Sequence, residues 1–317
     1  MGEFQLIERL LEPLARDFPG ALGLTDDAAL VDVPAGLQLV IAKDAMVADV
    51  HFLADDPAEQ VAGKLLRVNL SDLAAMGADP LGYLMVLARS PAIDDAWLSR
   101  FAAGLLADQR RFGCHLLGGD TVSTPGPLTL TLTILGTVPK GQALLRSGAR
   151  PGDDIWVSGT LGDAAIGLRV LRGLAVAEDE ALALVDRYRT PRPRLALGRA
   201  LRGLATAAID VSDGLVADLG HICTTSVVAA TLDATALPLS PVARGVPGAR
   251  EAALAGGDDY ELLFTASADR RLEIAALVAH LDHALTRIGT ISAGSGVKVH
   301  DGTGNQIVVE HGGWSHF

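Results

Sequence analysis

The 317-residue sequence contains few cysteines, few lysines and few aromatic residues. Its two cysteines, Cys114 and Cys223, lie far apart and form no Cys-x-x-Cys pair, which excludes a disulfide framework and a zinc knuckle. We expect both to be buried as small apolar side chains. No run reaches the roughly 18 consecutive apolar residues of a membrane-spanning helix. The first residues also lack the pattern of a signal peptide, so we expect a cytoplasmic protein with no membrane partner.

The scarcity of lysine and a formal net charge of −12 limit the possible partners. No run of Lys and Arg forms the basic stripe that a phosphate backbone requires, so we expect no nucleic-acid partner. The four lysines are Lys43, Lys64, Lys140 and Lys298, and none stands in a Gly-x-x-x-x-Gly-Lys-Ser/Thr loop. The standard P-loop is therefore absent. An anionic ligand would need other cations or a metal ion.

The length and the 49% of hydrophobic residues predict about two domains with ample core material. Gly, Pro and charged residues interrupt both helical and strand periodicity at 146–153. We place the domain boundary there, which predicts an N-terminal domain over 1–147 and a C-terminal domain over 148–317.

Apolar periodicity predicts helices and strands in both halves. The expected helices include 3–18, 57–77, 94–112 and 213–223. The expected strands include 29–33, 37–42, 82–88, 114–117, 128–138, 155–158, 207–211 and 227–232. Hairpin-like neighbours among them predict an α/β fold with α+β-like mixed sheets instead of one doubly wound parallel sheet.

Aspartates gather in five short clusters along the chain, several of them beside glycine. They are found at 24–27, 69–72, 118–120, 210–213 and 256–259. Carboxylates are preferred ligands of hard cations, and Mg²⁺ typically takes one or two of them while substrate phosphates complete its coordination. A single Asp-Gly cluster is equally well a turn. Five clusters together favour several magnesium ions and a phosphorylated ligand.

Two of these clusters follow strands and precede turns or helices. Paired glycines before Asp120 would let the backbone approach a phosphate closely. At 210–214, Ser212 or Asp213 is a credible N-cap of the following helix. Because the first amides of a helix are unpaired, an anion could also rest there.

Several segments of the chain resemble the thiamine-monophosphate kinase family, which belongs to the aminoimidazole ribonucleotide synthetase-like superfamily. The resembling segments are 2–4, 26–28, 47–52, 68–78, 118–121, 146–149, 209–215 and 259–262. The longest of them contains Val68-Asn69-Leu70-Ser71-Asp72-Leu73 and is highly specific. The resemblance runs nearly end to end and implies a two-domain fold whose N-terminal domains pair in a homodimer.

The resemblance implies that ATP phosphorylates thiamine monophosphate to thiamine diphosphate, by direct in-line transfer assisted by several Mg²⁺ ions. Donor and acceptor are both anionic, so cations must screen them. An ionised phosphate acceptor needs no general base. We therefore expect no catalytic Ser, His or Cys and no phosphoenzyme.

The resemblance also assigns roles to individual residues. The implied metal ligands are Asp27, Asp44, Asp72, Asp120, Asp210 and Asp213. The implied ATP contacts are Gly119, Asp120, Arg146 and Ser212, and Arg146 would also stabilise the transferring charge. The implied substrate contacts are His51, Asp258 and Trp314, where an aromatic face and a carboxylate suit the cationic thiazolium. Without the resemblance, His51 is an ordinary histidine and Trp314 a surface residue.

The chain departs from the family pattern at three places. Thr25 replaces a usual glycine, and Asp258 stands where Glu is common. Ala42 and Lys43 precede Asp44 where small hydroxyl residues are usual, so one ion site is weakened unless backbone carbonyls were the ligands there. The charge of Lys43 could instead replace that of an ion.

Three other functions fit the same aspartates. Another ATP-using enzyme of the superfamily is one, although the Cys beside Lys usual in selenophosphate synthetase is missing, since no Cys precedes Cys114. A metal-dependent phosphohydrolase would use the carboxylates to activate water. A non-catalytic nucleotide sensor would bind ATP without turnover.

Overall fold

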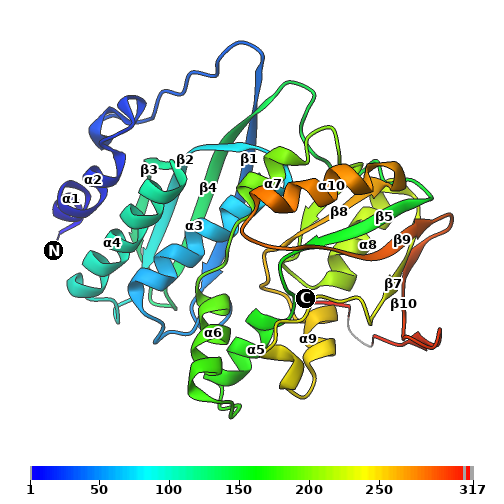
Figure 1. Ribbon diagram of the computed structural model, residues 1–317. Helices are drawn as coiled ribbons and strands as arrows, with labels where there is room; N and C mark the ends of the chain where they lie inside the picture. The colour runs from blue at the N-terminus through cyan, green and yellow to red at the C-terminus, as the bar shows by residue number, and fades with distance from the viewer. Residues whose placement is uncertain (1, 310–311, 315–317) are drawn as a thin grey trace. The chain divides into compact units, whose positions relative to one another are not determined.

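The computed structural model describes residues 2–309 and 312–314, and it divides into two compact units (Figure 1). Unit 1 comprises Met1–Leu73 and Ala78–Gly141, and unit 2 comprises Ala74–Gly77 and Gln142–Phe317. The domain ranges expected from the sequence, 1–147 and 148–317, stay a prediction.

Unit 1 is built on a four-stranded sheet in the order β1-β4-β2-β3. Its strands are β1 (Leu37–Val47), β2 (Asp79–Arg89), β3 (His115–Ser123) and β4 (Thr129–Pro139). β4 runs antiparallel to β1 and to β2, whereas β2 and β3 are parallel. Buried and half-buried residues alternate along β4, as in a strand with one covered face. The sheet is therefore mixed, which confirms the prediction.

Two long helices lie across one face of this sheet (Figure 1). They are α3 (Ala58–Ala75) and α4 (Asp95–Phe112). α4 begins at Asp94, whose carboxylate accepts the N–H of Trp97, and ends at Gly113 in the left-handed conformation. Both helices lie where the sequence predicted them.

The chain before β1 forms short helical turns and then an irregular stretch. The turns are α1 (Glu3–Leu6), the π-turn η1 (Ile7–Leu11), α2 (Glu12–Ala15) and the 3-10 turn η2 (Pro19–Leu24). The strand expected at 29–33 is wrong, because this stretch has no regular structure. The N–H of Leu30 donates to the carbonyl of Gly20 instead of to a neighbouring strand, and Leu30 stays 68% exposed. An apolar run forms a strand only where a partner strand pairs with it.

Unit 2 contains a seven-stranded sheet in the order β11-β10-β7-β9-β5-β8-β6. Its strands are β5 (Asp153–Ser158), β6 (Ala207–Asp210), β7 (Ala229–Asp233), β8 (Leu262–Ser267), β9 (Leu285–Ser292), β10 (Gly296–His300) and β11 (Gln306–Ile307). β7 and β10 are parallel and the other neighbouring pairs are antiparallel. This sheet is also mixed.

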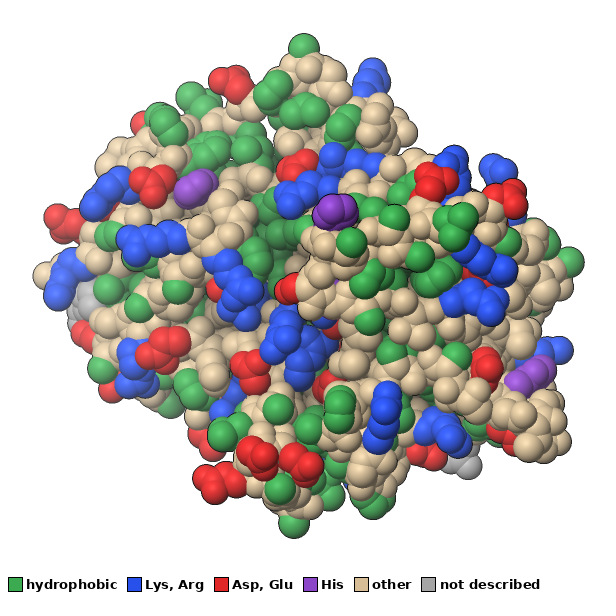
Figure 2. All heavy atoms as spheres, viewed as in Figure 1, with side chains coloured by type: hydrophobic (Ala, Val, Ile, Leu, Met, Phe, Trp, Pro, Cys, Tyr) green, Lys and Arg blue, Asp and Glu red, His purple; other side chains and the backbone are tan. Residues whose placement is uncertain are grey.

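Helices and 3-10 turns connect these strands. They are α5 (Asp163–Leu171), α6 (Glu178–Arg189), α7 (Leu195–Ala200), α8 (Leu215–Ser226), η3 (Ala243–Gly245), α9 (Ala249–Ala255), η4 (Ala268–Arg270), α10 (Arg271–Leu277) and η5 (Val278–His280). Among the described helices, none has both the length and the apolar character needed to cross a membrane. Acidic and basic side chains are interspersed on the face that Figure 2 shows.

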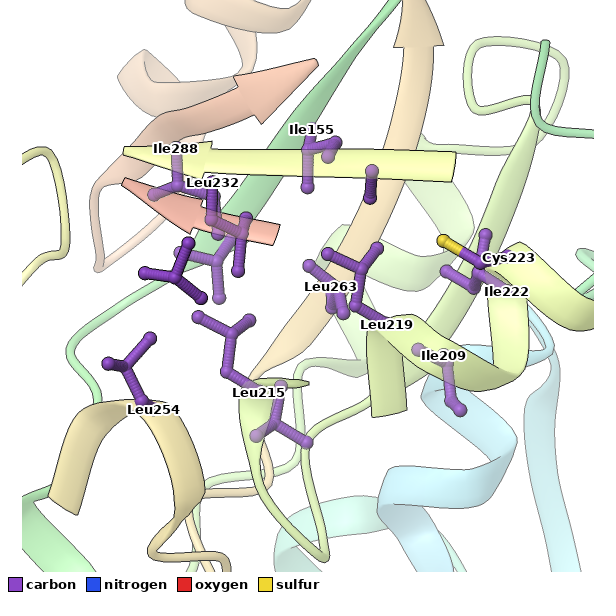
Figure 3. Packing of buried hydrophobic residues seen from close by; sticks show 14 of the residues in the cluster. Ile155, Ile209, Leu215, Leu219, Ile222, Cys223, Leu232, Leu254, Leu263 and Ile288 are labelled. Carbon is purple, nitrogen blue, oxygen red and sulfur yellow. The ribbon is translucent and has the colours of Figure 1, made fainter. Parts of the chain in front are cut away.

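The core of unit 2 forms where α8 packs against the sheet (Figure 3). Leu215, Leu219 and Ile222 recur at helical spacing on α8 and contact a cluster that includes Ile155 and Leu263 from the strands. All five are at most 2% exposed, and each such side chain contributes about 1.5–3 kcal/mol by burial. This packing holds α8 firmly, and with it the loop that joins β6 to α8.

Both cysteines are free and buried, as expected. Burial raises the pKa of Cys114 to about 12 and that of Cys223 to about 11. Neither thiol therefore carries the thiolate that nucleophilic chemistry would need.

Candidate active site

In unit 1, a cavity of about 190 Å³ lies beside the middle of β3, because the residues 118–120, expected as a turn after a strand, lie within this strand. Asp26, Asp27, Gly118, Gly119 and Asp120 are among the residues that line it. A Cβ atom on Gly119 would lie 1.8 Å from the carbonyl oxygen of Met85, so glycine is required there. The structure thus brings Asp27, Gly119 and Asp120 together, as a phosphate and metal site would need.

Asp44 lies on β1, which the strands β4 and β2 separate from β3. Three strand spacings amount to about 14 Å. Within this unit, Asp44 is therefore not part of the cavity that Asp27 and Asp120 line. Asp44 pairs with the fully buried Leu132, which places it on the covered face of the sheet, and Asp72 lies in the last turn of α3.

Lys43 precedes Asp44 on the strand, so its side chain points to the opposite, exposed face. Within this chain the Lys43 ammonium therefore does not stand beside Asp44 on the same face. This geometry argues against the hypothesis that Lys43 replaces the charge of an ion there.

His51 follows β1 in a tight loop. Its Nδ1 accepts the N–H of Val47 at 3.1 Å, and its carbonyl oxygen accepts a hydrogen bond from Nζ of Lys64 at 3.0 Å. Because Nδ1 is an acceptor, the proton of a neutral His51 is on Nε2. Lys64 on α3 is only 2% exposed, so a buried cation fixes the loop that carries His51.

In unit 2, the loop 210–214 connects β6 to α8 and is held by a residue of the helix. Oδ2 of Asp218 accepts the N–H groups of Ser212, Asp213 and Gly214, each at 3.1 Å. The N-cap is Gly214 (φ 134°), where a Cβ would lie 2.9 Å from the Ala255 backbone. The expectation of Ser212 or Asp213 as N-cap is therefore wrong, because the helix begins only after Gly214, which has no side chain to make a cap hydrogen bond.

The amides that Asp218 accepts belong to the loop and to the N-cap residue, so the expectation that an anion could rest at the first amides of α8 stays a prediction. Burial raises the pKa of Asp218 to about 7, and the nearby Asp210 adds to this effect. The N–H donors of Gly214 and Asp213 lower the pKa again in part.

Two carbonyl oxygens of the same loop accept hydrogen bonds from two further segments of unit 2. The N–H of Asp258 donates to Ser212 O at 2.8 Å, and the N–H of Trp314 donates to Asp213 O at 2.9 Å. Asp258 is in the left-handed conformation (φ 61°), and its carboxylate accepts a hydrogen bond from Oη of Tyr260 at 3.2 Å. The structure therefore gathers Asp210, Ser212, Asp213, Asp258 and Trp314 around one loop.

Arg146 lies elsewhere in unit 2. Its carbonyl oxygen accepts hydrogen bonds from the side chains of Thr225 and Ser226, at the C-terminal end of α8. A helix of 12 residues is about 18 Å long, so the Arg146 backbone stands a helix length from Ser212. The contact of Arg146 with ATP stays a prediction.

A buried ionic network, which was not predicted from the sequence, is centred on Glu261. Glu261 is fully buried and accepts hydrogen bonds from Arg187 at 2.8 Å, from Arg194 at 2.5 and 2.6 Å, and from Ser158 at 2.5 Å. Burial alone would raise the pKa of Glu261, but the two arginines and Ser158 hold it below its ordinary value. For the neighbouring Asp259, burial dominates and raises the pKa to about 8. The dense arginines at 187–194 were the available sequence signal.

Carboxylate oxygens are the type of ligand that a magnesium–nucleotide complex requires. Within residues 2–309 and 312–314, no three His, Cys, Asp or Glu side chains form a group that could hold a metal ion. Mg²⁺ needs only one or two protein carboxylates when phosphates and waters supply its other ligands. Asp27 with Asp120, and Asp210 with Asp213, provide such hard oxygen donors.

Comparison with known proteins agrees with this arrangement. The family described as AIR synthase related protein, N-terminal domain, matches residues 25–138, and the C-terminal domain of the same family matches residues 150–302. Hydrogenase maturation protein HypE in complex with ATP shares the fold at 20% identity (TM-score 0.79, 98% of this chain and 95% of that chain).

Curated relatives are similar over their whole length. Thiamine-monophosphate kinase of Caulobacter vibrioides is 44% identical over 99% of this chain and 90% of its own, and that of Escherichia coli K12 is 43% identical over 100% and 98%. The crystal structure of thiamine-monophosphate kinase from Stenotrophomonas maltophilia K279a has 46% identity and a TM-score of 0.86 over 94% of this chain and 96% of that chain. AaThiL complexed with AMPPCP and TMP has 31% identity and a TM-score of 0.80 over 100% and 97%. The chain therefore belongs to the AIR synthase related family, among the thiamine-monophosphate kinases.

Proposed function

We propose that this chain transfers the γ-phosphoryl group of ATP to the phosphate of thiamine monophosphate, giving thiamine diphosphate and ADP. The observation that carries the proposal is the loop 210–214. It joins Ser212 and Asp213, expected at ATP and metal, to Asp258 and Trp314, expected at thiamine monophosphate, through two backbone hydrogen bonds. The structure of AaThiL with AMPPCP and TMP supports the choice of both substrates.

Aspartates are proposed to hold several Mg²⁺ ions. The proposed ligands are Asp27, Asp44, Asp72, Asp120, Asp210 and Asp213. Bound Mg²⁺ would screen the negative charges of donor and acceptor, which otherwise repel each other. Asp27 and Asp120 line one cavity of unit 1 together with Gly119, which supports this role.

The protein itself is proposed to act by positioning. The phosphate of thiamine monophosphate is already ionised, so no side chain needs to remove a proton from the acceptor. Arg146 is proposed to donate hydrogen bonds to ATP, and its exposed side chain is open to such a ligand. We therefore assign no nucleophile, in keeping with in-line transfer.

Three side chains are proposed to select thiamine monophosphate. Trp314 is 59% exposed, so its indole face is accessible to the cationic thiazolium, and the Asp258 carboxylate supplies an opposite charge near the same loop. His51 is proposed as the third contact, since the hydrogen bonds of its Nδ1 and of its carbonyl oxygen hold its loop in place.

A product assay tests the proposed function. The protein is incubated with ATP, Mg²⁺ and thiamine monophosphate, and thiamine diphosphate and ADP are quantified beside a control without acceptor. We expect equal amounts of both products, formed only when the acceptor is present. ADP without thiamine diphosphate would identify a phosphohydrolase instead. ATP binding without any product would identify a nucleotide sensor or a superfamily enzyme with a different acceptor.

We also propose a cytoplasmic homodimer, formed through the open face of the unit 1 sheet. Ile41, Leu84 and Val122 lie on this face, opposite the buried Leu132, and are 61%, 41% and 43% exposed. Large apolar side chains on one face of a sheet are typical of an interface. We propose no nucleic-acid partner, in line with the net charge of −12.

A further inference from the structure

Asp218 belongs to α8 by sequence but serves the loop in front of that helix. It is 2% exposed, and one of its oxygens accepts three consecutive backbone N–H groups. These amides belong to the N-cap residue Gly214 and to the two residues before it, so the carboxylate of Asp218 reaches back from the first turn of α8 to the loop.

The opposite edge of the loop is held by hydrogen bonds to its carbonyl oxygens. Val211, Ser212 and Asp213 accept the N–H groups of Tyr260, Asp258 and Trp314 at 2.8, 2.8 and 2.9 Å. The backbone of the loop is thus bonded on both sides. Among the described residues, by contrast, Oγ of Ser212 and the carboxylate of Asp213 have no hydrogen-bond partner, so these two groups are available to a ligand.

We propose that Asp218 is a positioning residue that fixes the peptide groups 212–214, so that the side chains of Ser212 and Asp213 face the magnesium–nucleotide. Asp218 acts through the backbone and contacts neither nucleotide nor metal. The proposal rests on the proposed function for what Ser212 and Asp213 bind.

Three variants separate geometry from charge at this position. Asp218→Asn keeps an oxygen at the same reach and removes the negative charge. Asp218→Glu keeps the charge, but its extra methylene displaces the acceptor. Asp218→Ala removes the acceptor altogether.

Asp153→Ala is the matched control for a purely structural loss. Asp153 is 4% exposed, and its Oδ2 accepts the Arg150 N–H at 2.9 Å and a hydrogen bond from Thr206 Oγ1 at 2.7 Å. It therefore resembles Asp218 in burial and bonding. Thr206 precedes β6, whereas the loop follows it, so this control acts at the other end of the strand.

Two measurements are made on the full-length protein, beside the melting temperature. Amide hydrogen exchange of the peptide that covers 212–214 is followed without ligand. The dissociation constant of ADP in excess Mg²⁺ is measured by calorimetry. We expect Asp218→Ala and Asp218→Glu to speed exchange and to weaken Mg·ADP binding about tenfold, because well-aligned hydrogen bonds to the loop are lost. We expect Asp218→Asn to stay within about threefold and Asp153→Ala within about twofold of wild type.

Several results would overturn the proposal. One is an unchanged dissociation constant in Asp218→Ala despite a lowered melting temperature. Another is the reverse order, with Asp218→Glu like wild type and Asp218→Asn impaired, because charge and not geometry would then matter. If Asp218→Ala does not fold, the dissociation constants of Asp218→Asn and Asp218→Glu still distinguish geometry from charge. Unaltered exchange at 212–214 in Asp218→Glu would also contradict it. Exchange needs no ligand or turnover, so a failure of the kinase assay is distinguishable from a failure here.

Discussion

At the scale of single residues, Gly119 occupies a place where a methyl group has no room. Its Cβ would lie 1.8 Å from the Met85 carbonyl oxygen, whereas a Cβ on the adjacent Gly118 would meet only a Leu84 methyl at 3.4 Å. We expect Gly119→Ala to lower the free energy of unfolding by about 3 kcal/mol, since β3 must shift away from its neighbour β2.

Gly118→Ala is the control for this substitution and should stay within about 0.5 kcal/mol of wild type, apart from any ligand effect. Urea unfolding measures both variants, and calorimetry shows whether Mg·ATP binding falls with Gly119→Ala alone. Equal stability of the two variants would contradict the strand contact described above.

The sequence indicated a close backbone approach at Gly119 better than it indicated the local structure around Ser212. Two adjacent glycines favour such an approach, and here the approaching group is the carbonyl of Met85. The capping prediction failed because the helix begins after Gly214, a residue whose missing side chain gives no capping signal, while Asp218 in the helix bonds the loop in front of it. No simple sequence pattern predicts a buried carboxylate that accepts hydrogen bonds from the loop before its own helix.

At the scale of elements, Glu261 links α6, the segment before α7 and the start of β8. It compensates the charges of Arg187 and Arg194, which are 8% exposed. We expect Glu261→Gln to cost about 3 kcal/mol of unfolding free energy, because two buried cations lose their counter-charge. Thermal or urea unfolding measures the loss.

The exposed pair Arg270–Glu273 provides the comparison, with side chains 46% and 50% exposed. Glu273→Gln should change the unfolding free energy by less than about 1 kcal/mol, because solvent screens the pair. If the two Glu→Gln variants were equally stable, the network would contribute no more than a surface ion pair.

A second ionic cluster makes stability depend on pH. Hydrogen bonds from Arg271, and then from Arg287, hold the pKa of Asp154 below its ordinary value, although burial opposes them. A depressed carboxylate pKa stabilises the fold above the unfolded pKa of about 4. This contribution is lost as the pH falls through the lower, folded value.

We therefore expect the stability gap between wild type and Asp154→Asn to be full at pH 6 and to narrow below about pH 4. Urea unfolding over this range measures it. A gap that stayed constant with pH would show that the ionisation of Asp154 does not contribute.

Elements were predictable from the sequence where local signals mark them. α4 lies between an acidic cap at Asp94 and a glycine at Gly113, and both can be read without the fold. The ionic network could not be found in this way, since Arg194 and Glu261 lie 67 positions apart. The run at 29–33 has the composition of a strand but pairs with none of the described strands, and only the tertiary structure reveals that.

At the scale of the whole molecule, the open face of the unit 1 sheet predicts the oligomeric state. We expect Ile41→Lys to convert a dimer into a monomer at micromolar concentration, since a charge would be buried in the proposed interface. Light scattering after gel filtration measures the mass. Leu182→Lys alters another exposed leucine, 69% exposed on α6, and should remain a dimer. A dimeric Ile41→Lys would exclude this face.

The mixed sheets and the family followed from the sequence as a whole, through its motifs and hairpin-like neighbours. Where each aspartate stands did not follow, because Asp44 and Asp120 lie on opposite edges of one sheet. The spacing of residues along the chain does not reveal which strand forms which edge of a sheet.

The peptide framework around Ser212 couples the two proposed ligands. Since Asp258 and Trp314 are bonded to the carbonyls of Ser212 and Asp213, any shift of the loop on nucleotide binding would also displace the proposed thiamine contacts. Thermodynamic reciprocity then requires that thiamine monophosphate change the affinity for ATP by the same factor by which ATP changes the affinity for thiamine monophosphate. Any such coupling between the two proposed ligands would act through these two backbone hydrogen bonds.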